Sequence, residues 1–191
     1  MNDSAIYQTI KDAEHLRDEK RWAELLELCD KALRLIPRSD YFAHWFLATK
    51  AKAQAGLGCQ AAAYRNAEKA VQAEPGCVYS VWTLMSIGEQ IASEKPYSNH
   101  GNDTLLQCRK FLRRSPESIA AHPCSDGITV RAAKGLLNDC KFLLGFIYMA
   151  RNRPKLARKY FEEYLEARKH ISGDFTVGEA REALASVNGK S

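Results

Sequence analysis

At 191 residues the chain is long enough for one domain with a substantial core, or for a short helical array, and too short for two ordinary domains. Hydrophobic residues make up 46% and charged residues 27%, as in soluble globular proteins, and no apolar run approaches the roughly 20 residues that a membrane-spanning helix needs. The polar N-terminal residues lack the basic and apolar regions of a signal peptide, so we expect a cytoplasmic protein that makes no contact with a membrane.

The net charge of +5 is spread unevenly along the chain. Residues 100–170 contain 14 Lys or Arg against 7 Asp or Glu, whereas residues 1–99 contain 12 against 13. Such an excess favours an acidic partner, nucleic acid included, although a solvated helical surface has the same composition. The six cysteines lie sixteen or more residues apart without a CxxC pair, which excludes a common disulfide or zinc framework and predicts that most of them serve packing.

In chain order, the apolar periodicity predicts pairs of amphipathic helices. The expected pairs are 4–18 with 21–36, 41–56 with 59–74, and 78–93 with 103–115. The second helix of each pair ends in a similar segment, "CDKALRLIP", "AEKAVQAEP" or "CRKFLRRSP", and each of these segments closes on a proline that stops the helix. The prolines lie 38 and 41 residues apart, a period typical of solenoids of helical hairpins.

Three segments between these helices are expected to be irregular. "GLGCQA", residues 56–61, reads as the turn of the second hairpin. "EKPYSNHGND", residues 94–103, is expected to form a long loop because of its proline, asparagines and glycine. Residues 117–128 form an insertion with room for one short extra helix.

A fourth pair, in residues 129–170, carries the most specific pattern. Gly145 and Tyr148 in its first helix are followed by Ala157 and Phe161 in its second. A small residue at 145 or 157 allows the two helices to approach closely, and the aromatic rings fill the space beside that contact. Residues 176–188 then predict a closing helix, with Thr176 and Glu179 at the spacing of a capping box.

The segments L-G-x-x-Y from Leu144 and A-x-x-x-F from Ala157 resemble the tetratricopeptide repeat (TPR) family. The resemblance implies an all-α, right-handed solenoid of about four helical hairpins with a C-terminal capping helix, in a single domain over residues 1–191. The repeats would span about 4–37, 41–75, 78–116 and 129–170. In this family the first helix of each hairpin lines a concave groove that binds peptides. The residues that the resemblance places on this groove are Trp45, Lys52, Trp82, Met85, Glu89, Phe142, Phe146 and Met149.

The preferred hypothesis is therefore a non-enzymatic protein-interaction module, a scaffold, adaptor or small chaperone, that buries a partner segment in this groove. Aromatic and methionine stripes also occur in cores, and residues 117–128 could fold back over them, so groove and core both stay open. The alternative is a binder of nucleic acid or another polyanion. It would use a basic stripe of Arg109, Lys110, Arg113, Arg114, Arg151, Arg153, Lys155, Arg158 and Lys159.

The sequence contains none of the common catalytic, phosphate-loop or calcium-loop motifs, and we expect neither a cofactor nor a metal. His122 and Cys124 are the one pair that resembles a nucleophile with its base. An enzyme is the third hypothesis and would depend on this pair.

Overall fold

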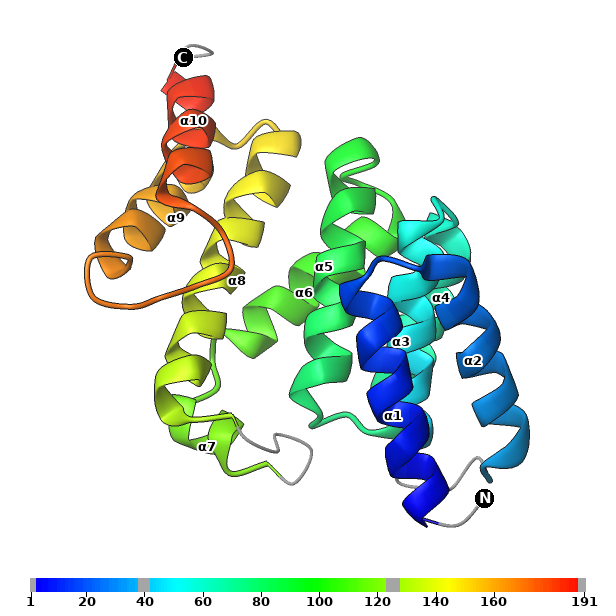
Figure 1. Cartoon of the computed structure of the whole chain (residues 1–191). Helices are drawn as coiled ribbons and strands as arrows, with labels where there is room; N and C mark the ends of the chain where they lie inside the picture. Colours follow the sequence, from blue (N-terminus) through cyan, green and yellow to red (C-terminus); the bar gives the residue numbers. More distant parts are fainter. Residues whose placement is uncertain (1–2, 38–41, 123–127, 189–191) are drawn as a thin grey trace. The chain divides into compact units, whose positions relative to one another are not determined.

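The computed structural model describes residues 3–37, 42–122 and 128–188, and all regular structure in these ranges is helical, which confirms the expected all-α class (Figure 1). The chain divides into two compact units, Met1–Ile87 and Gly88–Ser191. The helices of the first unit are α1 (Asp3–Asp18), α2 (Trp22–Leu35), α3 (Ala43–Gly56) and α4 (Gln60–Ala73), and α5 (Val78–Glu94) contains the boundary. Those of the second are α6 (Asn99–Phe111), α7 (Pro116–Ala120), α8 (Val130–Ala150), α9 (Pro154–Ala167) and α10 (Val177–Asn188).

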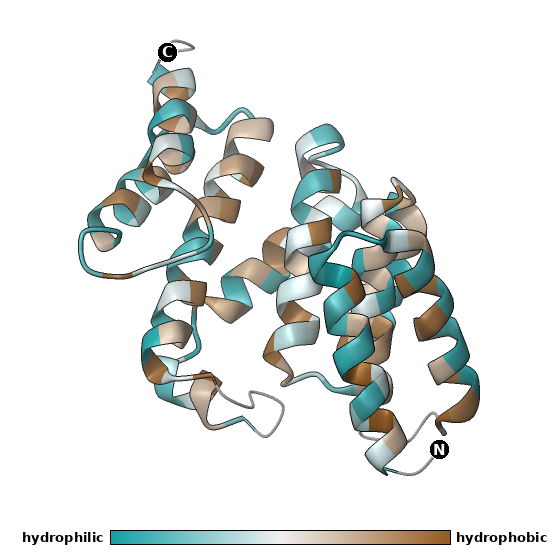
Figure 2. Ribbon diagram, in the orientation of Figure 1, coloured by the Kyte–Doolittle hydropathy of each residue, from teal (hydrophilic) through white to brown (hydrophobic). Residues whose placement is uncertain are grey.

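In unit 1, α1 packs against α2, α2 against α3, and α3 against α4. α1 and α2 each bury an apolar side and expose a polar side, as the alternation of hydrophobic and hydrophilic residues along them shows in Figure 2. The core of this unit forms around Ile6, Leu25, Cys29 and Phe46, which are almost completely buried. Burial raises the pKa of the Cys29 thiol to about 12, as expected of a packing cysteine.

Three helical hairpins have turns of the same backbone conformation. Lys20, Gly58 and Asn152 follow α1, α3 and α8 at the same place and have positive φ angles of 57°, 76° and 53°. In each turn the amide of the next residue donates to the carbonyl five residues before it, at 2.8–2.9 Å, which is the long hydrogen bond of a Schellman motif. The predicted turn at residues 56–61 is confirmed. The turns at Lys20 and Asn152 have the same backbone conformation, although their sequences differ from that of residues 56–61.

The hairpin of α5 and α6 is built differently, and the long loop expected at residues 94–103 is wrong. α6 already begins at Asn99, because Ser98 caps it: the Ser98 Oγ accepts a hydrogen bond from the Gly101 amide at 3.1 Å. Gly101, a loop signal in the sequence, lies in the first turn, where a Cβ would be 2.9 Å from the carbonyl oxygens of Lys95 and Pro96. The glycine therefore permits a close backbone contact between the first turn of α6 and the residues that precede the helix.

In unit 2, α8 packs against α6, α7, α9 and α10. The predicted close contact between α8 and α9 is confirmed, because a Cβ on Gly145 would overlap the ring of Phe161. The short extra helix in the insertion is present as α7. The capping box is also confirmed, since the Thr176 amide donates to Glu179 at 2.6 Å and the Glu179 amide donates to the Thr176 Oγ1 at 3.1 Å.

The segment before α10 lies directly on α8. A Cβ on Gly135 would lie 2.7 Å from the carbonyl oxygen of Ser172, and Gly173 lies against the carboxyl group of Asp139. Asp139 is 1% exposed and accepts a hydrogen bond from the Asp174 amide at 2.9 Å. Burial raises the pKa of Asp139 to about 6, although the hydrogen bond from the Asp174 amide opposes this.

Candidate functional site

The predicted groove residues are divided between the two units. Four of them belong to unit 1: Trp45, Lys52, Trp82 and Met85. The other four belong to unit 2: Glu89, Phe142, Phe146 and Met149. Each set is therefore described within its own unit.

In unit 1, Tyr79 at the start of α5 gathers the predicted residues of α3. The ring of Trp45 stacks on Tyr79 with 5.9 Å between ring centroids and 17° between planes. The Lys52 Nζ lies 4.3 Å from the centroid of the same ring, a cation–π contact. The structure thus brings Trp45 and Lys52 together through an aromatic residue that the sequence analysis did not select.

The Tyr79 hydroxyl also connects α1 with α3. It is 3.1 Å from the Thr49 hydroxyl and interacts electrostatically with the guanidinium group of Arg17. Burial raises the pKa of Tyr79, so the phenol is neutral over the physiological range. Residues from the first helices of three pairs therefore converge on one ring.

A second aromatic pair lies between the same two helices. Tyr7 of α1 is 57% exposed, and its ring meets Phe42 edge to face at 5.4 Å. We call the surface of these residues the first-helix face, defined by Tyr7, Arg17, Phe42, Trp45, Lys52 and Tyr79. The sequence did not single out Tyr7 or Tyr79, although Tyr79 precedes the expected groove residue Trp82 by three positions on the same helix.

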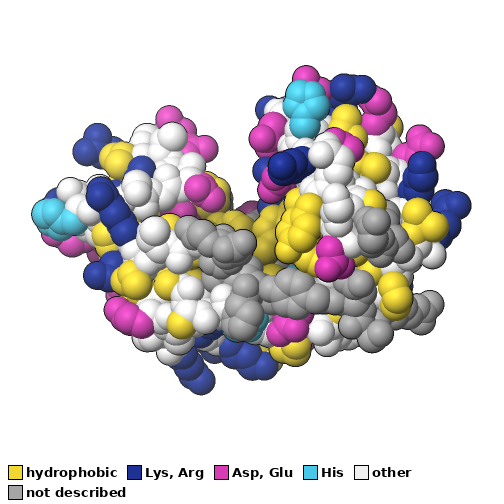
Figure 3. All heavy atoms as spheres, turned by 60° about the horizontal axis from the view of Figure 1, so that its bottom comes forward, with side chains coloured by type: hydrophobic (Ala, Val, Ile, Leu, Met, Phe, Trp, Pro, Cys, Tyr) yellow, Lys and Arg dark blue, Asp and Glu magenta, His cyan; other side chains and the backbone are white. Residues whose placement is uncertain are grey.

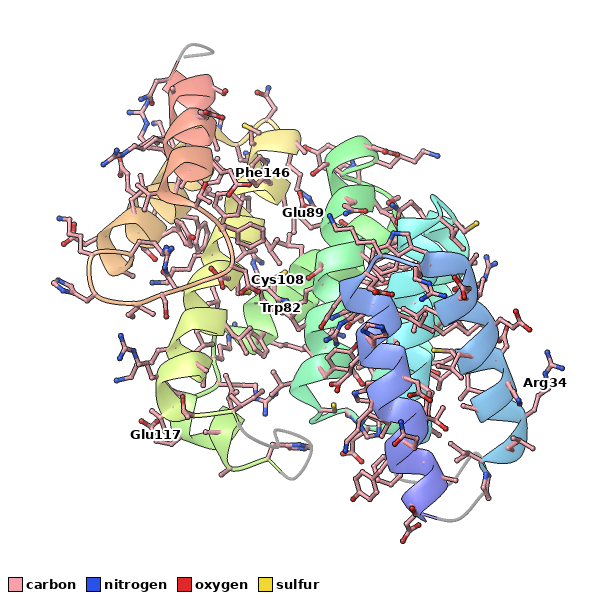
Figure 4. The ribbon with its side chains drawn as sticks, in the orientation of Figure 1. Arg34, Trp82, Glu89, Cys108, Glu117 and Phe146 are labelled. Atoms are coloured by element: carbon pink, nitrogen blue, oxygen red, sulfur yellow. The ribbon has the colours of Figure 1, made fainter. Side chains whose placement is uncertain are left out.

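The other predicted groove residues of unit 1 differ in exposure. Trp82, labelled in Figure 4, is half-buried. Met85 is completely buried and serves packing.

In unit 2, Phe142 belongs to the core. Its ring stacks on Phe175 at 4.3 Å between centroids and contacts Tyr164 at 5.1 Å and Phe161 at 5.7 Å. Phe146 is half-buried and packs edge to face on Phe161 at 5.3 Å. Only the partly exposed edge of this cluster, together with the half-buried Met149 and Glu89, remains available to a partner.

The basic residues of unit 2 fall into two groups. Arg151 is half-buried and donates to the Asn102 Oδ1 at 2.7 Å, and Arg114 lies over the ring of Phe111 at 5.8 Å. These two arginines stabilise the unit itself. The other predicted members of the stripe are exposed: Arg109, Lys110, Arg113, Arg153, Lys155, Arg158 and Lys159.

The charge difference between the units is smaller than that between residues 1–99 and residues 100–170, but it has the same sign. Unit 1 contains 11 Lys or Arg and 11 Asp or Glu, and unit 2 contains 17 and 12. On the face shown in Figure 3, basic side chains lie among acidic and uncharged ones and form no continuous band. On that face the basic residues therefore lie in small separate groups.

The predicted nucleophile pair cannot be placed, because Cys124 lies outside the described residues. A different pair joins Cys77, directly before α5, with His44 in the first turn of α3. Burial raises the pKa of Cys77, but hydrogen bonds to His44 and Ser80 outweigh this effect and lower it to about 7. Cys77 is 1% exposed and His44 is 5% exposed, so a substrate has no access to this pair as it stands.

No family model matches the chain, and no match is found among curated proteins or among solved structures. Among the described residues, no helix has the length and apolar character required to cross a membrane. The features that bear on function are therefore the first-helix face, the exposed basic residues of unit 2 and the repeated turn.

Proposed function

We propose that the protein is a TPR-like helical-hairpin module that binds a segment of a partner protein on the first-helix face of unit 1. The observation that carries this proposal is the convergence of Trp45, Lys52 and Arg17 on Tyr79 from three first helices. Tyr7 of α1 and Phe42, directly before α3, form a second aromatic contact. Aromatic rings with neighbouring cations supply large contact areas at low entropic cost, as binding surfaces require.

The repeated turn supports the family part of the proposal. Three hairpins use the same backbone conformation and the same long hydrogen bond, although the residues in the left-handed position are Lys20, Gly58 and Asn152. A recurring local geometry with variable sequence is typical of internal repeats.

The chemistry of the face indicates the chemistry of the partner. The rings of Tyr7 and Trp45 favour apolar or aromatic side chains, whereas Arg17 and Lys52 favour a flanking carboxylate. Arg17 pairs with Asp18 at 3.1 Å, and the Lys52 Nζ lies 4.3 Å from the centroid of the Tyr79 ring, so both cations border the aromatic residues of the face. The partner segment is therefore apolar with an acidic residue beside its anchor, and binding requires no chemical step.

The proposal can be tested by site-specific cross-linking and capture. A photoreactive phenylalanine analogue at position 7 lies on the face, and the same analogue at Leu35, 54% exposed on α2, is the matched control. We expect a protein partner in native lysate to cross-link to the first position and not to the second. The Lys52→Glu and Tyr7→Glu variants should lose this partner at low and high salt, and Leu35→Glu should retain it.

Circular dichroism of each variant establishes that its helices are intact. Capture of the same proteins by Tyr7→Glu, Lys52→Glu and the wild type would exclude the first-helix face as the binding surface. Recovery of nucleic acid alone, released by salt from all variants equally, would transfer the function to the basic residues of unit 2.

A further inference from the structure

An open pocket of about 300 Å³ lies in unit 2, where the end of α6 meets α9. Arg109, Leu112 and Arg113 line it from the α6 side, and Tyr160 lines it from α9. Two arginines one helical turn apart thus face one concavity, and none of the described residues that line it is a carboxylate.

The orientation of Arg109 is fixed by a buried tyrosine. Its Nε donates to the Tyr148 Oη at 3.1 Å, and its Nη2 donates to the same oxygen. The ring of Tyr148 is 5% exposed and stacks on Tyr160, with 5.5 Å between centroids and 5° between planes. Because a guanidinium group has five N–H donors, three of those on Arg109 are left for a ligand.

Arg113 and Tyr160 also have unused donors. Within the described part of the chain, the Arg113 side chain and the Tyr160 hydroxyl make no hydrogen bond or ion pair. Burial, and next the neighbouring Tyr148, raises the pKa of Tyr160, so its hydroxyl keeps its proton and can donate it to an anion.

The carboxylate whose charge acts on Tyr160, Glu163, is close to two lysines. Glu163 follows Tyr160 by three residues on α9 and lies 3.8 Å from the Lys159 Nζ and 3.9 Å from the Lys141 Nζ. Exposed cations at Lys110, Arg153, Lys155 and Arg158 add to the positive potential of this part of unit 2.

We propose that this pocket binds the phosphomonoester group of a phosphorylated side chain in a partner protein. A phosphomonoester carries about −1.5 to −2 charges at neutral pH, which balances the charge of two guanidinium groups. A single carboxylate in the partner would balance only one of them. Planar arginine donors bind phosphate oxygens in pairs, and Leu112 offers an apolar wall for the carbon atoms that carry the phosphate.

A nucleic acid fits the pocket less well for two reasons. Each phosphodiester carries a single charge, and one face of Tyr160 is already covered by Tyr148, which leaves less aromatic surface for base stacking. The inference shares with the proposed function only the idea that the partner is a protein, since all its residues belong to unit 2.

The test uses the full chain and titrates it with phenyl phosphate, phenyl sulfate and a thymidine decanucleotide, followed by NMR shifts of the amide and arginine side-chain groups. We expect phenyl phosphate to bind at least fivefold more tightly than phenyl sulfate at pH 7.5. This advantage should fall toward pH 5.5, because the second phosphate pKa is near 6 and the phosphate becomes a monoanion.

The decisive variant is Arg113→Ala, because the Arg113 side chain is exposed and has no hydrogen bond or ion pair with the described residues. It should weaken the binding of phenyl phosphate at least tenfold, and Arg113→Lys should restore this binding in part. Tyr160→Phe should weaken the binding of phenyl phosphate about threefold. Lys31→Ala, at an exposed position of α2 in unit 1, should change nothing. Equal affinity for phosphate and sulfate, an unaffected Arg113→Ala variant, or decanucleotide binding that depends on Arg113 while phenyl phosphate binding does not would each overturn the proposal.

Discussion

Gly145 sets the distance between α8 and α9 by the absence of a side chain. A Cβ at this position would lie 2.7 Å from the Cδ1 of Phe161, inside the ring's van der Waals contact, and the ring is completely buried. Neither helix can yield without displacing the aromatic cluster around Phe142, which contacts the same ring.

Gly145→Ala should therefore destabilise the protein even though alanine favours helix. The helical preference contributes up to about 1 kcal/mol, whereas overpacking a buried contact costs about 1–3 kcal/mol. We expect urea unfolding to show a loss of about 1–2 kcal/mol. Gly178→Ala in α10 is the matched control, because its Cβ would meet no atom closer than the Thr176 Oγ1 at 3.7 Å, and it should be neutral or stabilising. A loss of the same size in both variants would contradict the packing explanation.

Asp139 predicts a specific pH dependence of stability. Burial raises its pKa in the folded protein to about 6 from an ordinary value of 3.8, so the folded state holds the proton more tightly than the unfolded state does. The stabilising contribution of this proton is complete below about pH 4 and is lost as the pH rises through about 6. Asp139→Asn removes the titration and keeps an oxygen that can accept from the Asp174 amide.

Thermal unfolding of the wild type and Asp139→Asn should give midpoints that differ little at pH 4 and increasingly favour the variant up to pH 7.5. Glu27→Gln, at an exposed position of α2, controls for the loss of one charge and should show no such divergence. A constant difference between wild type and Asp139→Asn across this range would show that the Asp139 carboxyl does not titrate as its burial implies.

At the residue scale, local spacings could be predicted and distant contacts could not. The capping box of Thr176 and Glu179 and the glycine of α8 depend on residues a few positions apart or on one hairpin. The contact of Arg109 with Tyr148 spans 39 residues, and the gathering of Arg17, Trp45 and Lys52 at Tyr79 needs the packing of three helices. Sequence periodicity indicates a face of one helix and leaves its neighbours undetermined.

At the scale of elements, the three equivalent turns allow three residue types to be compared in the same left-handed position. Lys20 adopts a left-handed conformation that costs a residue with a Cβ roughly 1–2 kcal/mol, and glycine at position 58 avoids that cost. Asparagine tolerates the conformation better than lysine does, so Asn152 is the intermediate case.

Lys20→Gly should accordingly raise the free energy of unfolding by about 0.5–1 kcal/mol, since relief of strain exceeds the entropy that glycine adds to the unfolded chain. Asn152→Gly should gain less, and Gly58→Ala should lose about 1 kcal/mol. Lys95→Gly is the control, because Lys95 lies between α5 and α6 without a positive φ, and it should gain nothing. A gain in Lys95→Gly equal to that in Lys20→Gly would argue against backbone strain as the cause.

The helices themselves were predictable from the sequence because their apolar positions recur every three to four residues. The start of α6 was not, because Asn99 and Gly101 belong to residue types that favour loops. The side chain of Ser98 and the close carbonyls of Lys95 and Pro96 override that preference. Local composition is therefore least informative where a cap and a tight backbone contact coincide.

At the scale of the whole molecule, the sequence locates the charge in the C-terminal half, and the structure assigns it to a compact unit. The boundary between the units falls between Ile87 and Gly88, inside α5 and inside the segment expected as the third repeat. Sequence periodicity contained no signal for this boundary, because the helical pattern continues through it. The proposed surfaces lie on either side of it, so each can be altered without changing residues of the other.

The unequal charges of the units have a consequence for the kinetics of recognition. Unit 1 has equal numbers of basic and acidic residues, whereas unit 2 has 17 against 12, so long-range attraction toward an acidic partner acts on unit 2. Such attraction extends over a Debye length of about 8 Å at physiological ionic strength and governs the rate of encounter. The lifetime of a complex on the first-helix face is instead set by desolvated aromatic contacts, which salt hardly weakens. For a partner that unit 2 attracts and the first-helix face holds, added salt would slow arrival and hardly change departure.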